Sequence, residues 1–491
     1  MARTSTRPHY NVTFAVLLLG VAAYSLLQSM VIPVLPTLMT DLHTTQDTAT
    51  WLMTGYLLSA SVATPILGRI GDMVGKERML IVTLLALTGG SVLAGLSNSI
   101  SLMIVARVIQ GLGGGVLPIS FGIIRDEFPA ERVRGAVGIT AALTAFGGGI
   151  GLLLAGPIVD NMDYHWLFWF PAIMTGVATV ATFLWVPESP VRTPGRISWG
   201  AALLLSGWLV ALLLAVSEGP TWGWGSARII GLFVATVVFA ALWIMVELRS
   251  DAPLIDMRMM RIPAVWTANL VALLFGVVMY TTMTFLPQLV QTPEKLAGYG
   301  FGASITQSGI YMLPMTIGMF IFGVLSGPLS VRFGSKMVLV AGSLLTIVPF
   351  VLLGTADDRA WEIYVASSVM GIGMGLAFSS MSSIVVEAVS PAQTGVASGM
   401  NANIRTIGGA IGSGIAASIL ANGVTIAHPL PKASGYTTTF WMMAGAAVLA
   451  TVAALLIPAA RKSAGKTVSE HLGTQAPGTQ DAPEGEEAKT V

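Results

Sequence analysis

The chain has 491 residues, of which 54% are hydrophobic and 10% are charged, and it contains no cysteine. Soluble globular proteins carry about 25% charged residues, so this composition excludes a soluble fold and places most of the chain in a bilayer. The formal net charge is +1, which provides no basic surface for nucleic acid. The absence of cysteine excludes disulfides, and the five histidines show no metal-binding spacing, so we expect no metal and no cofactor.

The first predicted element runs from Phe14 to Pro36 and contains no charged residue. At about 1.5 Å per residue it reaches roughly 34 Å, which is enough to cross a hydrocarbon core of about 30 Å. Arg3 and Arg7 precede this apolar run, as in a signal peptide, but the run continues well past the small residues that would form a cleavage site. We therefore expect an uncleaved first membrane span.

Apolar runs bounded by charged or turn residues predict further spans along the chain. Together with the first they form a series of fourteen, arranged as six, two and six. The predicted spans are residues 14–36, 49–68, 79–97, 101–123, 135–158, 165–186, 198–217, 228–247, 264–290, 304–330, 337–354, 362–386, 396–420 and 438–458.

The distribution of basic residues predicts the orientation of these spans. With both termini in the cytoplasm, 19 of the 25 Lys and Arg residues fall in cytoplasmic segments and four, Arg228, Lys295, Arg359 and Lys432, fall in outer loops. Short cytoplasmic loops are enriched in positive charge, so this asymmetry supports the orientation.

An internal repeat supports the same division. The segment from Gly68 to Lys76 recurs as Gly327 to Lys336, each after the second span of a six-helix unit. The expected domains are a six-helix bundle at 1–190, two linking helices at 191–262, a second bundle at 263–460 and a disordered tail at 461–491. Parallel repeats of this kind place a substrate cavity between the two halves, near the bilayer midplane.

The loop from Gly68 to Arg78 resembles the signature that follows the second span in the major facilitator superfamily. The resemblance implies that a charge cluster here gates the cytoplasmic side. A solvated basic loop is the alternative, but it does not explain the spacing of Gly68, Asp72 and Gly75. The expected gating residues are Gly68, Arg69, Asp72, Gly75, Lys76 and Arg78.

Arg107 lies inside the fourth predicted span, in a segment that resembles the second superfamily signature. An arginine at the centre of a span costs roughly 2.5 to 3.5 kcal/mol on insertion scales, so it is a functional candidate by default. The resemblance implies a role in proton transfer, which makes Asp72 and Arg107 the proton-coupling candidates. The alternative is a buried arginine that binds neighbouring carbonyls.

The segment from Gly395 to Gly412, with Asn401, Asn403 and Arg405, is similar to the thirteenth span of the fourteen-span drug:proton antiporters. The segments 253–258 and 221–224 resemble the same family, and together these motifs cover nearly the whole chain. The resemblance implies an all-α polytopic membrane protein with the major facilitator fold, fourteen transmembrane helices and both termini cytoplasmic.

Two positions depart from the family pattern. The family usually has an Asp in the first span, and the aligned position holds Leu27, beside Gln28. In the fifth span Leu152 replaces a helix-bending proline, although Pro157 lies near the next turn. The commonest proton site is therefore missing.

The residues that we expect to line the cavity are polar or aromatic. No Asp or Glu lies near the middle of a predicted span, so a cationic substrate would lack a counter-charge and the cavity suits neutral or anionic amphiphiles. The candidates are Tyr24, Gln28, Arg107, Gln110, Asn269, Tyr280, Asn401, Asn403 and Arg405.

We expect a monomeric efflux transporter of a bacterial plasma membrane, with small lipophilic substrates, membrane lipid and protons as its partners. A second hypothesis is export or flipping of lipid-like amphiphiles, or a facilitator without proton coupling. A third is a membrane-bound enzyme or sensor, which needs paired carboxylates, a histidine cluster or a folded soluble domain. The sequence supplies none of these.

Overall fold

The computed structural model describes residues 9–189, 198–250, 253–355, 359–422 and 430–458. Every regular element in these ranges is a helix. Fourteen of the helical segments are long and apolar enough to cross a membrane, which confirms the predicted number of spans. The predicted tail at 461–491 lies outside the described residues, and the six-two-six domain boundaries stay a prediction.

The spans are built from long helices, some of them joined by a short turn of 3₁₀-helix. The shorter helices are α2 (Leu35–Asp41), α11 (Met257–Met260) and α13 (Glu294–Ala297). The long ones are α1 (Tyr10–Met30), α3 (Gln46–Val74), α4 (Lys76–Gly95), α5 (Ile100–Gly111), α6 (Val116–Glu127), α7 (Ala130–Asn161), α8 (Trp166–Trp185), α9 (Trp199–Trp222), α10 (Ala227–Arg249), α12 (Pro263–Gln291), α14 (Ile305–Phe333), α15 (Ser335–Thr355), α16 (Ala360–Ala388), α17 (Thr394–Ala421) and α18 (Ala433–Leu456).

The repeated motif forms a one-residue turn in each half of the chain, so the loop expected from Gly68 to Arg78 is wrong. Helix α3 continues to Val74 and α4 begins at Lys76, with Gly75 alone between them at φ 135°. Gly334 makes the equivalent turn between α14 and α15 at φ 87°. Residues with a side chain rarely adopt these φ values, so glycine lets the chain reverse direction between two helices without a loop. We call the end of the molecule that carries these turns the gating end.

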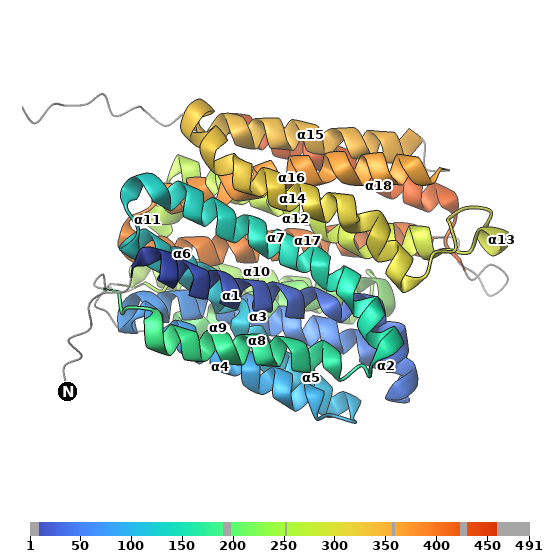
Figure 1. Ribbon diagram of the computed structural model, residues 1–491, viewed down its shortest axis with the longest axis horizontal. Coiled ribbons are helices and arrows are strands. Elements are labelled where there is room, and N and C mark those ends of the chain that lie inside the picture. Colours follow the sequence, from blue (N-terminus) through green and yellow to red (C-terminus); the bar gives the residue numbers. More distant parts are fainter. Residues whose placement is uncertain (1–8, 190–197, 251–252, 356–358, 423–429, 459–491) are drawn as a thin grey trace, which may run out of the picture. The chain divides into compact units, whose positions relative to one another are not determined.

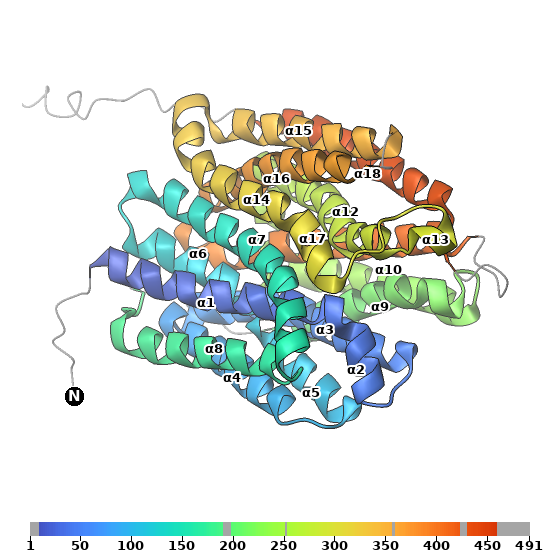
Figure 2. The same cartoon turned by 45° about the vertical axis from the view of Figure 1, so that its right-hand side comes forward.

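The long helices form two groups that lie side by side (Figures 1 and 2). We call α1 to α8 the N-terminal bundle and α12 to α18 the C-terminal bundle. Within the first, α1 packs on α7 and α8, and α4 packs on α5 and α8. Within the second, α16 packs on α14 and α15, and α12 packs on α17. The two bundles meet chiefly where α7 packs on α14 and α3 packs on α17, and we call the whole interface between the bundles the seam.

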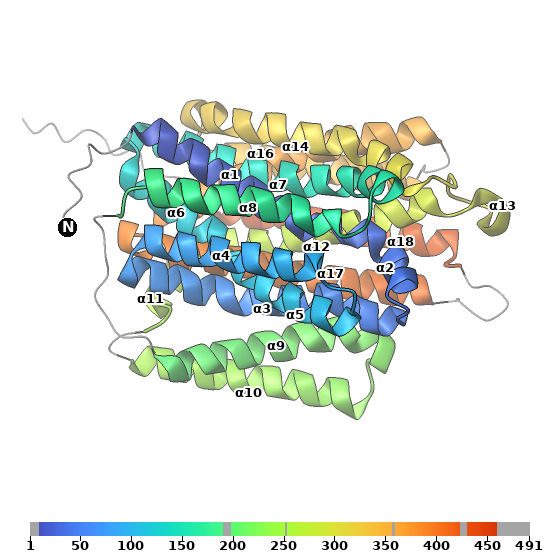
Figure 3. The same ribbon diagram turned by 60° about the horizontal axis from the view of Figure 1, so that its bottom comes forward.

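The two extra helices, α9 and α10, form a hairpin beside the seam (Figure 3). Helix α9 contacts α3 of one bundle and α17 of the other, and α10 packs on α9. Large apolar side chains of α10 remain exposed, for example Val237 at 69%. In a bilayer these side chains face lipid, so the hairpin is a membrane element and not a soluble linker.

The orientation of the spans can be tested by labelling because the chain has no native cysteine. Gly225 lies in the α9–α10 turn and Ala130 begins α7 at the gating end, and both are exposed. We expect a membrane-impermeant maleimide to label Gly225→Cys in intact cells and Ala130→Cys only after permeabilisation, because the basic residues place the gating end in the cytoplasm. The reverse pattern would invert the predicted topology.

Candidate functional site

Arg107 is completely buried, and all its hydrogen-bond partners lie within the N-terminal bundle. Its Nε donates to the Leu52 carbonyl at 3.0 Å, and one terminal nitrogen donates to Gln110 Oε1 at 3.0 Å and to the Leu27 carbonyl at 3.4 Å. The guanidinium also lies over the Tyr56 ring, 4.4 Å from its centre. This geometry is that of a hub that binds carbonyls of α1 and α3, the alternative that the sequence left open for Arg107.

The other predicted cavity residues fall into separate places. Gln110 donates to Ser91 at 3.2 Å within the N-terminal bundle, so it points away from the seam. Asn401 donates to Asn269 at 2.9 Å, which ties α17 to α12 inside the C-terminal bundle. Asn403 is buried, and neither of its side-chain polar atoms has a hydrogen-bond partner.

Tyr24, Tyr280 and Arg405 remain together at the seam, and Gln28 lies one turn from Tyr24. Tyr24 of α1 interacts electrostatically with Tyr280 of α12 and with Arg405 of α17, so this group joins both bundles. Gln28 follows Tyr24 by one helical turn and therefore shares its face of α1. Tyr24, Gln28 and Tyr280 are only partly buried. They form the part of the predicted cavity that the structure brings together.

Lys76 holds two carboxylates at the gating end. Its Nζ lies 2.6 Å from Asp126 Oδ2 and 3.6 Å from Asp72 Oδ1, and all three side chains are at most 1% exposed. Ser189 donates a further hydrogen bond to Asp126. Of the four residues in this cluster, the sequence motif contains only Lys76 and Asp72. Asp126 and Ser189 were missed because they come from distant parts of the chain.

Arg78 and Gly75 both lie against Glu188 at the turn between α3 and α4. Arg78 Nε lies 3.5 Å from Glu188 Oε2, and its side chain is 65% exposed, so this ion pair is a weak surface contact. The Glu188 carboxylate also sits against Gly75, where an added Cβ would lie 2.4 Å from Oε2. Glycine at this position is therefore required both by its φ and by the space that Glu188 occupies.

Asp72 and Gly68 face the other bundle across the seam. An added Cβ on Gly68 would lie 2.9 Å from the Gly395 carbonyl, and one on Gly395 would lie 3.0 Å from Asp72 Oδ2. The Val396 backbone N–H interacts with the carboxylate, although neither oxygen meets the geometry of a full hydrogen bond. Asp72 therefore lies at the first turn of α17, where the helix dipole favours a negative charge.

Two further polar contacts cross the seam at the same end, and the sequence motifs did not indicate them. Arg125 of α6 donates to the Val386 carbonyl and to Thr394 Oγ1, the latter at 3.2 Å. Arg134 of α7 pairs with Glu387 of α16. Their positions at span ends were visible in the sequence, but nothing there indicated which residues they meet. Together with Asp72 these contacts join the two bundles at the gating end.

Leu27 and Leu152, the two departures from the family pattern, are packing residues, exposed by 0% and 5%. Leu27 presents only its carbonyl to Arg107. Beside Leu152, Gly151 packs on α1, where an added Cβ would lie 2.1 Å from Ser29 Oγ. Position 27, where the family usually has a proton-binding Asp, therefore carries no carboxylate.

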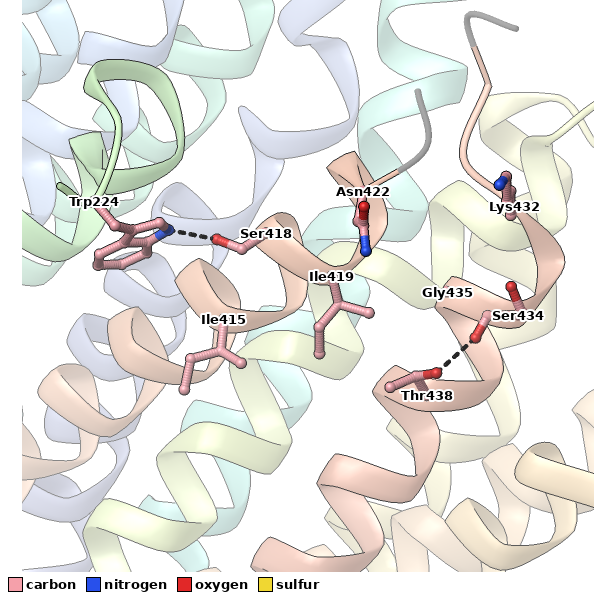
Figure 4. Close-up of a pocket in the computed structure, with 9 residues that line it drawn as sticks. All are labelled: Trp224, Ile415, Ser418, Ile419, Asn422, Lys432, Ser434, Gly435 and Thr438. Atoms are coloured by element: carbon pink, nitrogen blue, oxygen red, sulfur yellow. Dashed lines mark hydrogen bonds between the residues drawn. The ribbon is translucent and has the colours of Figure 1, made fainter. Parts of the chain in front are cut away.

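A cavity of about 730 Å³ opens at the end opposite the gate, between the α9–α10 turn and helices α17 and α18 (Figure 4). Trp224 lines it and donates to Ser418 at 2.7 Å, while Lys432 and Thr438 line it from α18 and its N-cap. A second, almost wholly apolar groove of about 490 Å³ lies between α3, α5 and α9. Neither hollow contains a residue of the predicted cavity.

Fourteen apolar spans, six in each bundle and two in the hairpin, with a charged one-residue turn after the second span of the first bundle and its repeat in the second, define a polytopic membrane protein of two related halves. The family model of the Major Facilitator Superfamily matches residues 17–412 and 268–479, and the chain belongs to this superfamily.

Similar proteins include transporters of bacteria. An uncharacterized MFS-type transporter of Mycobacterium tuberculosis is 31% identical over 424 residues, and the match covers 84% of this chain and 60% of that protein. Multidrug resistance protein 3 of Bacillus subtilis is 28% identical over 425 residues, covering 85% of this chain and 81% of that protein. The structure of the human organic anion transporter MFSD10 aligns with a TM-score of 0.67 at 16% identity, covers 91% of this chain and 100% of that chain, and shows the fold alone.

The buried ion pairs at Lys76 allow a stability prediction. Lys76→Met leaves Asp72 and Asp126 buried without their cation, and breaking a buried pair in this way costs about 3 to 5 kcal/mol. We expect the apparent melting temperature in detergent to fall by several degrees. Arg78→Met is the control, since its exposed pair contributes only about 0 to 1 kcal/mol. Equal melting temperatures for the two variants would contradict a buried ionic cluster.

Proposed function

We propose that the protein exports small lipophilic molecules by alternating access between its two bundles, as a proton antiporter of a bacterial plasma membrane. The observation that carries this proposal is the set of contacts that close the gating end while Tyr24, Gln28, Tyr280 and Arg405 gather between the bundles. The Bacillus subtilis relative is a multidrug resistance protein, which supports small lipophilic substrates. Both bundles and the seam come from one chain, which supports a functional monomer.

The gate in this proposal depends on the charge of Asp72. Its carboxylate is buried at the first turn of α17 and has only incomplete hydrogen bonds there. Protonation of Asp72 removes the attraction to the helix dipole, and it also weakens the attraction between Asp72 and Lys76. Separation of α3 from α17 would then open the gating end to substrate from the cytoplasm. Arg107 contributes by holding α1 and α3 in register during this motion.

A second candidate function is favoured by Leu27. The first span carries no carboxylate at this position, so a facilitator or an exporter of lipid-like amphiphiles without proton coupling needs no further residue. The apolar groove between α3, α5 and α9 supports the same reading, because it offers a hydrocarbon chain a place at the membrane surface of the bundle. Dependence on a proton gradient separates the two functions.

Efflux from proteoliposomes tests the proposal. A panel of lipophilic dyes is loaded, and a proton gradient is imposed or collapsed with an uncoupler. We expect gradient-dependent efflux by the wild-type protein and at least a tenfold loss in Asp72→Asn, because the uncharged amide no longer responds to protons. Asp163→Asn is the matched control, since Asp163 lies outside the spans.

Two other outcomes are informative. Efflux that ignores the gradient in both wild type and Asp72→Asn would overturn proton coupling and leave the facilitator function. Absence of movement for every dye, by a protein that remains folded in the vesicles, would overturn export of lipophilic molecules.

A further inference from the structure

Arg405 is a buried cation that the described residues leave without a counter-charge. Its side chain is 8% exposed, its Nε has no hydrogen-bond partner, and no ion pair in the described ranges includes it. Arg107 is buried to a similar extent, but its hydrogen bonds go to carbonyl oxygens of its own bundle. Burying an unpaired charge is costly, so Arg405 is poised to accept an anion.

The position of Arg405 places this charge near the bilayer midplane. It is the twelfth residue of α17, roughly 16 Å from the start of that helix. The backbone there is pressed against α12, because an added Cβ on Gly276 would lie 2.0 Å from the Arg405 carbonyl. The close packing of α17 on α12 fixes the position of the Arg405 backbone, from which its side chain extends.

Aromatic groups surround the guanidinium. Its Cζ lies 4.5 Å from the centre of the Phe378 ring, and it interacts with Tyr280 and Tyr24. Both tyrosines are partly exposed and are not sealed inside either bundle. The site therefore combines one fixed cation with flat apolar surfaces and hydroxyl donors, and Tyr24 belongs to the opposite bundle.

We propose that the transported substrates are lipophilic organic anions, whose carboxylate or sulfonate pairs with Arg405 while an aromatic or alkyl body lies against Phe378, Tyr24 and Tyr280. This inference rests on the export function proposed above. A guanidinium matches the planar geometry of a carboxylate and forms two parallel hydrogen bonds with it. A cationic substrate would be repelled by Arg405, and no described Asp or Glu interacts with that residue to balance the charge.

The charge of the substrate also changes the energetics of export. An anion that leaves a cell with a negative interior moves down the membrane potential, so each exported charge is driven outward without any proton site. Export of an anion therefore does not require a proton-binding carboxylate in the first span, where this chain has Leu27. The substrate itself supplies the counter-charge that the helices lack.

A matched pair of permanently charged probes tests this proposal in proteoliposomes of the full chain. One probe is pyrene-1-sulfonate and the other is (1-pyrenylmethyl)trimethylammonium, which share an aromatic body and differ in charge. We expect the sulfonate to leave at least tenfold faster than the ammonium probe. A potential with the vesicle interior negative, imposed by potassium and valinomycin, should accelerate the sulfonate further.

Variants locate the effect at Arg405. Arg405→Gln should lower sulfonate efflux at least tenfold, and Arg405→Lys should retain part of it because the charge remains. Arg332→Gln is the matched control, since Arg332 is exposed at the gating end of the same bundle. If Arg405→Gln does not fold, the wild-type preference between the two probes still decides the question.

The failures of the two proposals are distinguishable. Faster efflux of the ammonium probe, or wild-type sulfonate efflux by a folded Arg405→Gln, would overturn the anion site and leave export intact. If both probes leave equally fast and their efflux depends on chloride, an inorganic anion and not the substrate binds at Arg405. That result would also overturn the proposal. If no dye of the earlier panel and neither probe moves, export itself is wrong.

Discussion

The hydrocarbon core of the bilayer is the constraint on which the rest of this structure depends. Without water, each backbone group must find its partner within its own helix, and each charge must find one within the protein. The described spans obey the first condition, since they are helical throughout, and their carboxylates lie toward the ends. The buried charge of Lys76 is compensated by two carboxylates. The buried guanidinium of Arg107 donates hydrogen bonds to carbonyls of α1 and α3. Against this background Arg405 is the exception.

Small residues determine how closely the helices approach. Helix α7 lies between the two bundles because it has glycines on more than one face: an added Cβ on Gly147 would lie 2.7 Å from Ser25 Cβ of α1, and one on Gly149 would lie 2.0 Å from Thr316 Oγ1 of α14. The same is true of α17, where Gly408 meets the Leu273 carbonyl of α12 and Gly399 meets α3. Because these residues have no side chain, the backbones of neighbouring helices approach closely at the seam.

Hydropathy predicted the spans and their number, because these depend on local composition. It did not predict that α3 continues as a helix to Val74, since the charges of the motif hid the helix from a hydropathy pattern. Nor did it distinguish Arg107 from Arg405. Both are single arginines inside apolar runs. Only the tertiary packing shows that Arg107 donates to carbonyls of its own bundle, whereas Arg405 lies among aromatic side chains of both bundles. A hydropathy pattern reports which segments cross the membrane but not which faces meet.

The energies of the contacts at the gating end suit a gate. The partly exposed pair of Arg134 and Glu387 contributes about 0 to 1 kcal/mol, and a carboxylate at a helix N-terminus contributes at most about 2 kcal/mol. By contrast, Lys76 and Asp126 are held within a single bundle, where their buried pair resists disruption by about 3 to 5 kcal/mol. The strong contacts therefore keep each bundle rigid, and the weak ones join the bundles. A ligand or a proton can shift an equilibrium only by its own differential binding energy, and contacts worth at most about 2 kcal/mol each lie within the range that such binding supplies.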